Sequence, residues 1–133
     1  LVSALKDLIN RFEGEAYPDI FFQYYNIDEK LDDMTALSIY RIIQELITNT
    51  IKHAGADEIL IQLTTEGDDI VIEYEDDGKG FDPEKLVTKK GMGVENIQSR
   101  INYLKGSLSF NSRENEGVSY LIRIPYTKAM SHV

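Results

Sequence analysis

The spacing of apolar residues along the chain alternates between two periods, which predict where helices and strands lie. Apolar residues three or four positions apart predict an amphipathic helix over residues 1–12, a second helix that ends near His53 and a third that ends near Gly106. The apolar faces of these helices consist of Leu1, Leu5, Leu8, Ile9 and Phe12, of Leu37, Tyr40, Ile43, Ile47 and Ile51, and of Val94, Ile97, Ile101 and Leu104. We expect Asp32 or Asp33 to cap the second helix.

Strand patterns occupy most of the remaining chain. The aromatic-rich segment 20–25 predicts one strand. Alternating runs over 58–64 and 69–75 predict a hairpin, and a second hairpin follows over 107–112 and 118–125. Because strands in hairpins pair antiparallel and amphipathic helices must bury one face, we expect an α+β fold. We expect a two-layer α/β sandwich of antiparallel strands with helices on one face.

The composition narrows the classes of function. A chain of 133 residues, 42% of them hydrophobic, has the size of one compact globular domain. The absence of cysteine excludes disulfide scaffolds, thiolate metal sites and cysteine nucleophiles. The net charge of −9 argues against nucleic acid or an anionic membrane as a partner, although a few cations and backbone N–H groups would still hold a phosphate. No apolar run is long enough for a membrane span, and no signal peptide opens the chain.

A polar stripe follows one face of the second predicted helix, opposite its apolar residues. It consists of Arg41, Glu45, Thr48, Asn49 and Lys52. One interpretation is a solvated outer face. The other is a site for phosphate and Mg²⁺, in which Asn49 supplies an oxygen ligand, Lys52 a positive charge, and Glu45 orients a metal-bound water.

Two glycine-containing segments each have two interpretations. Residues 75–81 follow a predicted strand, and their Asp-Gly pair is typical of a turn. Alternatively, Gly78 and Gly80 let the backbone approach a planar ligand while a carboxylate accepts a hydrogen bond from it. Residues 91–93 (Gly-Met-Gly) begin a helix after two lysines, either as a simple joint or as a phosphate-binding helix start. The chain has neither a Rossmann glycine fingerprint nor a P-loop.

In combination and in order, these segments resemble the motifs of the gyrase, Hsp90, histidine kinase and MutL (GHKL) superfamily. Residues 44–54 (QELITNTIKHA) resemble its N box, residues 76–81 (DDGKGF) its first glycine box, and residues 91–100 (GMGVENIQSR) its second. Residues 117–125 are similar to its closing strand. The resemblance spans about residues 18–125 and is strongest to the ATP-binding domains of bacterial sensor histidine kinases, in the subfamily of the nitrate sensor and DesK-like kinases.

The resemblance implies a Bergerat fold, in which a mixed, mostly antiparallel sheet is covered on one face by about three helices. This domain would bind Mg-ATP and donate its γ-phosphate to a histidine on a separate dimerisation domain. By that resemblance Asn49 matches the Mg²⁺ ligand, Lys52 and His53 match residues near the phosphates, and Asp76 matches the adenine-binding carboxylate. Glu45 matches the general base of the superfamily's hydrolases, and in a kinase it would organise the magnesium and water shell. The other positions that match ATP-binding residues are Gly78, Gly80, Lys89, Gly91, Met92, Gly93 and Val94, with residues 82–90 as a mobile lid.

The resemblance also implies what surrounds this domain. Residues 1–17 would lead from a dimerisation domain, residues 18–126 would form the ATP-binding domain, and residues 127–133 a disordered tail. Neither His53 nor His132 matches the phosphoacceptor, which would lie on the dimerisation domain of the same polypeptide. The expected partners are that domain, a response regulator and a second copy of the full-length protein, with no nucleic acid and no direct membrane contact. The expected location is the cytoplasmic side of a membrane-anchored sensor.

One departure from the family pattern and two alternative functions stay open. The closing box of the family has Gly-Thr, whereas this chain has Gly117-Val118, so a hydroxyl contact from position 118 is not expected. A stand-alone serine protein kinase of the same superfamily, like an anti-sigma factor, would carry the same motifs. So would a nucleotide-sensing interaction module without catalysis.

Overall fold

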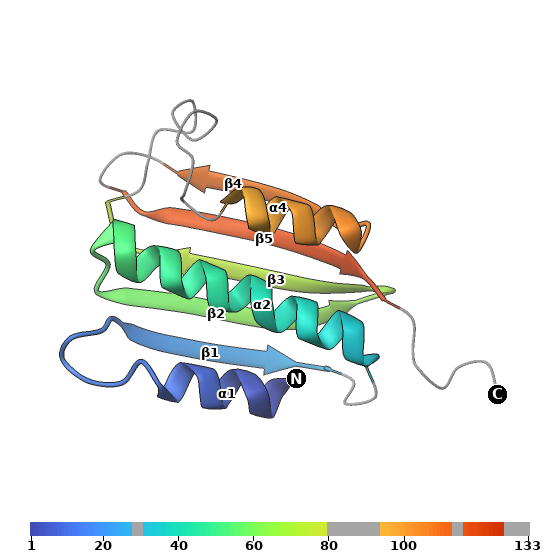
Figure 1. Cartoon of the computed structure of the whole chain (residues 1–133), viewed down its shortest axis with the longest axis horizontal. Coiled ribbons are helices and arrows are strands. Elements are labelled where there is room, and N and C mark those ends of the chain that lie inside the picture. Colours follow the sequence, from blue (N-terminus) through green and yellow to red (C-terminus); the bar gives the residue numbers. More distant parts are fainter. Residues whose placement is uncertain (28–30, 80–93, 113–115, 127–133) are drawn as a thin grey trace.

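A computed structural model describes residues 1–27, 31–79, 94–112 and 116–126, and this part of the chain forms two layers. One layer is a five-stranded sheet in the order β1-β2-β3-β5-β4. The other consists of helices on one face of that sheet (Figure 1). The elements are α1 (Val2–Asn10), β1 (Asp19–Tyr25), α2 (Asp33–Asn49), the π-helical turn η1 (Thr50–Ala54), β2 (Glu58–Glu66), β3 (Asp69–Asp76), α4 (Val94–Tyr103), β4 (Ser107–Ser112) and β5 (Val118–Pro125).

The sheet confirms the expected fold class. β2 and β3 form one antiparallel hairpin, β4 and β5 form the other, and β5 pairs with β3 to join the two hairpins. β1 has no hairpin partner and pairs with β2 in parallel, from Asp19 opposite Glu58 to Tyr25 opposite Thr64. A parallel pair needs a long crossover connection, which α2 and η1 provide across one face of the sheet (Figure 1).

The buried stripe of α2 differs in phase from the expected one. Leu37, predicted to face the core, is 52% exposed. The residues of α2 that pack into the hydrophobic core are Ile39, Ile42, Ile43, Leu46 and Ile47. These lie within one stripe because each residue of an α-helix turns about 100° from the last, and Leu37 lies about 120° around the helix from Ile43. Apolar spacing therefore identified the helix but not the centre of its buried face.

The ends of the second helix are set by local hydrogen bonds. Asp32, rather than Asp33, is the N-cap, because its Oδ2 accepts a 3.0 Å hydrogen bond from the backbone N–H of Thr35. The α-helix ends at Asn49 instead of continuing to His53, and η1 takes its place up to Gly55, whose left-handed conformation closes the turn.

Two threonines explain why the regular helix stops there. The Oγ1 atom of Thr48 donates to the carbonyl oxygen of Gln44 at 2.8 Å, and Oγ1 of Thr50 lies 3.1 Å from the carbonyl oxygen of Leu46. Side-chain hydroxyls that bond to the carbonyl four residues back compete with the backbone and often bend a helix. The π-helical turn begins at Thr50 itself, and such turns are frequent at functional sites.

The core fills the space between the helices and the inner face of the sheet. Its strand residues include Ile59, Ile61 and Leu63 of β2, Ile70, Ile72 and Tyr74 of β3, and Ile122 and Ile124 of β5. Leu5 and Leu8 of α1 and Ile97 and Ile101 of α4 belong to the same cluster, so α1, α2 and α4 share one core. In the described ranges, no helix combines the length and the hydropathy that a membrane span requires.

Candidate functional site

Asp76, the last residue of β3, is a buried carboxylate at one end of the sheet. It is 7% exposed, and strand alternation points it to the same face as Tyr74, towards the helices. Its Oδ1 accepts a 3.0 Å hydrogen bond from the backbone N–H of Gly78, and its Oδ2 accepts a 2.9 Å bond from Oγ1 of Thr50. The backbone N–H of Val118 donates a further bond. The end of β3 is thus connected directly to η1, through Thr50, and to β5, through Val118.

The electrostatics of Asp76 follow from its burial. Desolvation raises the pKa of its carboxyl, because the charged form loses water, while the hydrogen bonds from Gly78 and Thr50 act in the opposite direction. Burial also raises the pKa of Tyr74 and of Tyr120, so both phenols keep their hydroxyl hydrogens. The hydroxyl oxygen of Tyr74 lies 2.6 Å from Oγ1 of Thr50 and 3.0 Å from the carbonyl oxygen of Leu46.

The neighbouring acid, Asp77, has a different task. Its side chain is on the exposed side, and its Oδ1 accepts hydrogen bonds from the backbone N–H groups of Asp57 and Glu58, at 2.8 and 2.9 Å. These bonds fasten the segment after β3 to the start of β2. Two adjacent acids that look alike in the sequence are therefore separated by strand alternation into one buried and one structural group.

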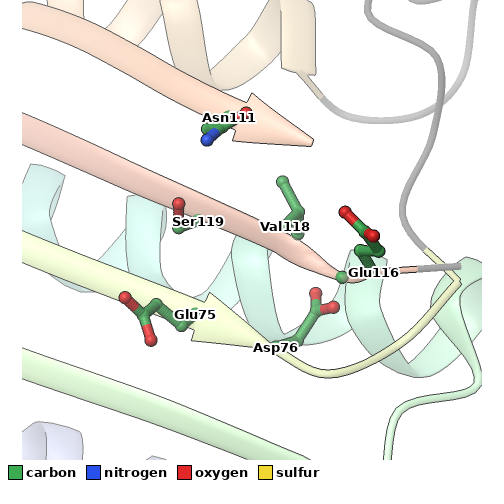
Figure 2. A pocket seen from close by; sticks show the side chains of 7 residues that line it. Glu75, Asp76, Asn111, Glu116, Val118 and Ser119 are labelled. Atoms are coloured by element: carbon green, nitrogen blue, oxygen red, sulfur yellow. The ribbon is translucent and has the colours of Figure 1, made fainter. Parts of the chain in front are cut away.

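The second hairpin closes against Asp76 at Gly117. This glycine has φ 82°, and a Cβ built on it would overlap the backbone oxygen of Asp76. Only glycine allows both the conformation and the close approach. Figure 2 shows the result: Val118 and Asp76 lie on neighbouring strand ends, beside a hollow of about 380 Å³. The hollow is lined by Glu75, Asp76, Asn111, Glu116, Gly117, Val118 and Ser119.

The polar stripe of the N box lies at the same end of the molecule, because Thr50 of η1 directly follows Asn49. Asn49 and Glu45 are half-buried, whereas Lys52 and His53 are exposed. The Nδ2 atom of Asn49 is buried and has no hydrogen-bond partner among the described residues. A buried donor without a partner costs about 1–3 kcal/mol, so its retention is typical of a site that a polar ligand or water completes.

The described structure brings together only part of the expected site. Asp76 is bonded to Gly78 and to Thr50, and Asn49 directly precedes Thr50 in the chain. Gly80, Lys89, Gly91, Met92 and Gly93, together with the expected lid over 82–90 and the tail over 127–133, lie outside the described residues. Val94 begins α4, and its side chain is likewise not described.

Two residues of the site were not identified from the sequence. Thr50 is 4% exposed and Tyr74 is fully buried, and both contribute hydroxyls to the surroundings of Asp76. Tyr74 precedes Asp76 by two positions on a predicted strand, which was a signal that both face the same way. No comparable signal placed Thr50 against β3, because that contact depends on how α2 and η1 lie across the sheet.

The chain matches a known protein family over most of its length. The model of the "Histidine kinase-, DNA gyrase B-, and HSP90-like ATPase" family matches residues 34–128, which is most of the chain. The chain belongs to this family. The resemblance of its motifs to the GHKL superfamily is thereby confirmed.

Its curated relatives include sensor histidine kinases. The chain is 36% identical over 125 residues to the sensor histidine kinase ComP of Bacillus subtilis, covering 93% of this chain and 16% of ComP. It is 29% identical over 128 residues to the histidine-protein kinase/phosphatase DegS of Brevibacillus brevis, covering 96% of this chain and 33% of DegS. The chain therefore spans at most a third of these two relatives.

Solved histidine kinase structures share the fold. The catalytic domain of the histidine kinase ThkA superposes with a TM-score of 0.76 at 20% identity, covering 96% of this chain and 92% of that one. A blue-light-activated histidine kinase of Erythrobacter litoralis gives a TM-score of 0.74 at 20% identity, covering 96% of this chain and 41% of that one. These matches confirm the α/β sandwich.

The raised pKa of Asp76 leads to a prediction about Asp76→Asn. The asparagine carbonyl accepts from Gly78, and its amide donates to Thr50 Oγ1, so the bonds to Gly78 and Thr50 are kept. The folded state binds the Asp76 proton more tightly than the unfolded state does. Wild-type stability relative to the variant is therefore greatest below the ordinary Asp pKa of 3.8 and falls as pH rises through the raised value.

Urea unfolding of the nucleotide-free domain between pH 4 and pH 8 measures this difference. We expect Asp76→Asn to gain stability relative to wild type as pH rises. Glu73→Gln removes an exposed charge from the same strand and serves as the control. A relative gain that shrinks with rising pH would contradict the burial argument.

Proposed function

We propose that this domain binds Mg-ATP and donates the γ-phosphate to a histidine on a separate dimerisation domain of a two-component sensor kinase. The observation that carries the proposal is the buried carboxylate of Asp76. An ionised carboxylate offers about four lone-pair positions, and Gly78, Thr50 and Val118 use three of them. The remaining position suits a ligand that donates a hydrogen bond, such as the exocyclic amino group of adenine.

The N box supports a phosphate and magnesium site beside this carboxylate. Asn49 would hold the magnesium through its side-chain oxygen, Glu45 would orient a water in the metal shell, and Lys52 would place a positive charge near the phosphates. The Nδ2 atom of Asn49, which has no partner in the described part of the chain, supports a polar ligand at this position. Bound Mg²⁺ would neutralise phosphate charge, while the residues of the chain position the nucleotide. On sequence resemblance, His53, Gly78, Gly80, Lys89, Gly91, Met92, Gly93 and Val94 complete the proposed ATP site.

The relatives support the assignment to a histidine kinase. ComP and DegS are sensor histidine kinases, and this chain matches one segment of each. We propose that the full-length protein is a homodimer, with the phosphoacceptor histidine on a dimerisation domain joined through the residues before 18, and with a response regulator as the final phosphate acceptor. In this arrangement the domain alone binds ATP, with hydrolysis slow or absent, because the phosphoacceptor histidine lies on the dimerisation domain.

Nucleotide binding is tested by thermal unfolding with Mg-ADP or a non-hydrolysable ATP analogue. A ligand that binds only the folded state at a hundred times its Kd adds about 2.7 kcal/mol of stability, so the Tm rises. Asp76→Asn should lose most of this rise. Glu73→Gln, which removes an exposed acid two residues from the end of the same strand, should keep it. No rise at millimolar nucleotide, or an equal rise in Asp76→Asn, would contradict the proposal.

The magnesium role of Asn49 is tested by Asn49→Ala. Because the substitution removes an unpartnered buried donor and introduces a better helix former, the nucleotide-free variant should be at least as stable as wild type. The increase in ADP affinity on adding Mg²⁺ should nevertheless fall roughly tenfold, as one charge-assisted interaction is lost. Titration calorimetry with Mg²⁺ and with EDTA measures both affinities, and Asn10→Ala on the exposed end of α1 is the control. An unchanged magnesium effect argues against Asn49 as a ligand.

The phosphate acceptor separates the histidine kinase from the serine kinase alternative. The domain is incubated with γ-labelled ATP and the dimerisation domain of its own full-length protein. Phosphohistidine is lost in acid and survives in base, so we expect label that disappears after acid treatment. Acid-stable label would favour a serine kinase, and no label at all on any acceptor would favour a nucleotide-sensing module.

A further inference from the structure

Among the described residues, three groups donate hydrogen bonds to the Asp76 carboxylate, and one of these three is a side chain. The backbone N–H groups of Gly78 and Val118 are fixed by the course of the chain. The third donor is the hydroxyl of Thr50, which reaches Oδ2 from the helix layer at 2.9 Å. A substitution of Thr50 therefore changes the hydrogen bonds that hold the carboxylate without moving the backbone.

The count of hydroxyl hydrogens fixes the direction of the hydrogen bonds behind Asp76. Thr50 Oγ1 lies 2.6 Å from the Tyr74 hydroxyl and 3.1 Å from the carbonyl oxygen of Leu46, in addition to its contact with Asp76. A threonine hydroxyl has one hydrogen, and an ionised carboxylate only accepts. When Asp76 is charged, Thr50 donates to Oδ2. The single hydrogen of Tyr74 then goes to Thr50 across the 2.6 Å contact, in preference to the longer 3.0 Å contact of the same hydroxyl with the carbonyl oxygen of Leu46.

The burial of Tyr74 supports this direction. Its side chain is fully buried, and desolvation keeps the phenol protonated, so its hydrogen stays available for Thr50. A chain of hydrogen bonds that runs from Tyr74 through Thr50 to Asp76 polarises each member and strengthens the last bond. Tyr74 and Thr50 together hold one oxygen of the carboxylate in place.

The strand opposite Asp76 provides no side-chain donor. Val118 is paired directly with Asp76 in the β3–β5 register, and its side chain is buried on the same face. Cβ atoms of directly opposed residues lie about 4.5–5.5 Å apart, within reach of a hydroxyl. A threonine at 118 would have the shape of valine and a hydroxyl beside the carboxylate, so position 118 offers a place from which the contribution of Thr50 is replaceable.

We propose that Thr50 is a positioning and specificity-determining residue, which orients the Asp76 carboxylate so that its one free lone-pair position faces the amino group of an adenine nucleotide. This inference rests on the proposed function, since it concerns how that same site selects its base. The reason for selectivity is chemical: an amino group donates to the held oxygen, whereas a carbonyl group at the same place repels it. Without the Thr50 bond the carboxylate rotates and the distinction weakens.

The test compares ADP with inosine diphosphate, which carries a carbonyl in place of the adenine amino group. Titration calorimetry gives the Kd of each for wild type, Thr50→Val, Thr50→Ser and the double variant Thr50→Val/Val118→Thr. We expect Thr50→Val to weaken ADP binding roughly tenfold or more, as a hydrogen bond to a charged group is lost, and to lower the ratio of the two affinities. Thr50→Ser should remain near wild type, and Val118→Thr should recover most of the loss.

The outcomes separate this inference from the proposed function. A merely structural Thr50 would change the Tm but leave the affinity ratio of the folded protein unchanged, and that result overturns the inference while ATP binding stands. Absence of ADP binding by wild type overturns both. If Thr50→Val does not fold, Tyr74→Phe tests the same chain of hydroxyls, since it removes the donor behind Thr50. In that case, an affinity ratio in Tyr74→Phe equal to that of wild type would overturn the inference.

Discussion

The packing of α2 against the sheet is the interaction on which the candidate site depends. Five apolar side chains of this helix, from Ile39 to Ile47, are buried in the same core as β2, β3 and β5. Burial of each side chain contributes about 1.5–3 kcal/mol of transfer free energy, so the helix has one favourable position on the sheet. In that position Asn49 and Thr50 lie near the end of β3, where Thr50 contacts Asp76. The hydrogen bonds of the site are consequences of an apolar fit made elsewhere.

The site itself holds groups that oppose folding. Asp76 loses hydration on burial, and Asn49 keeps a buried donor without a partner among the described residues. Asn49 ends α2 and Asp76 ends β3, and both elements pack into the hydrophobic core. The stability that these two polar groups cost the fold is supplied by that core. Such local departures from ordinary packing rules concentrate where a protein binds something. The unfavourable burial of the Asp76 carboxylate and of the Asn49 donor therefore supports a ligand at this end of the sheet.

The sequence predicted the elements far better than their mutual arrangement. Strand alternation and glycine turns located both hairpins, because these signals are local, and the bounds of β4 and β5 agree with the structure. The parallel pairing of β1, the exposure of Leu37 and the π-helical turn at Thr50 could not be read in this way, since each depends on packing between distant segments or on competing hydrogen bonds. The same limit applies to the site. Asp76 was found through its motif, whereas Thr50 and Tyr74 become visible only when α2 is placed over β3.

Gly117, directly before β5, links the residue allowed at its own position to the placement of Asp76 on β3. Glu116, directly before it, is exposed, and exposed positions ordinarily accept substitutions with little effect. At Gly117, however, any side chain would press on the backbone oxygen of Asp76 and move β5 away from β3. The amide of Val118, which bonds to the carboxylate, would move with it. One of the two α-hydrogens of Gly117, at the place where any other residue carries its Cβ, therefore sets how far the two strands approach.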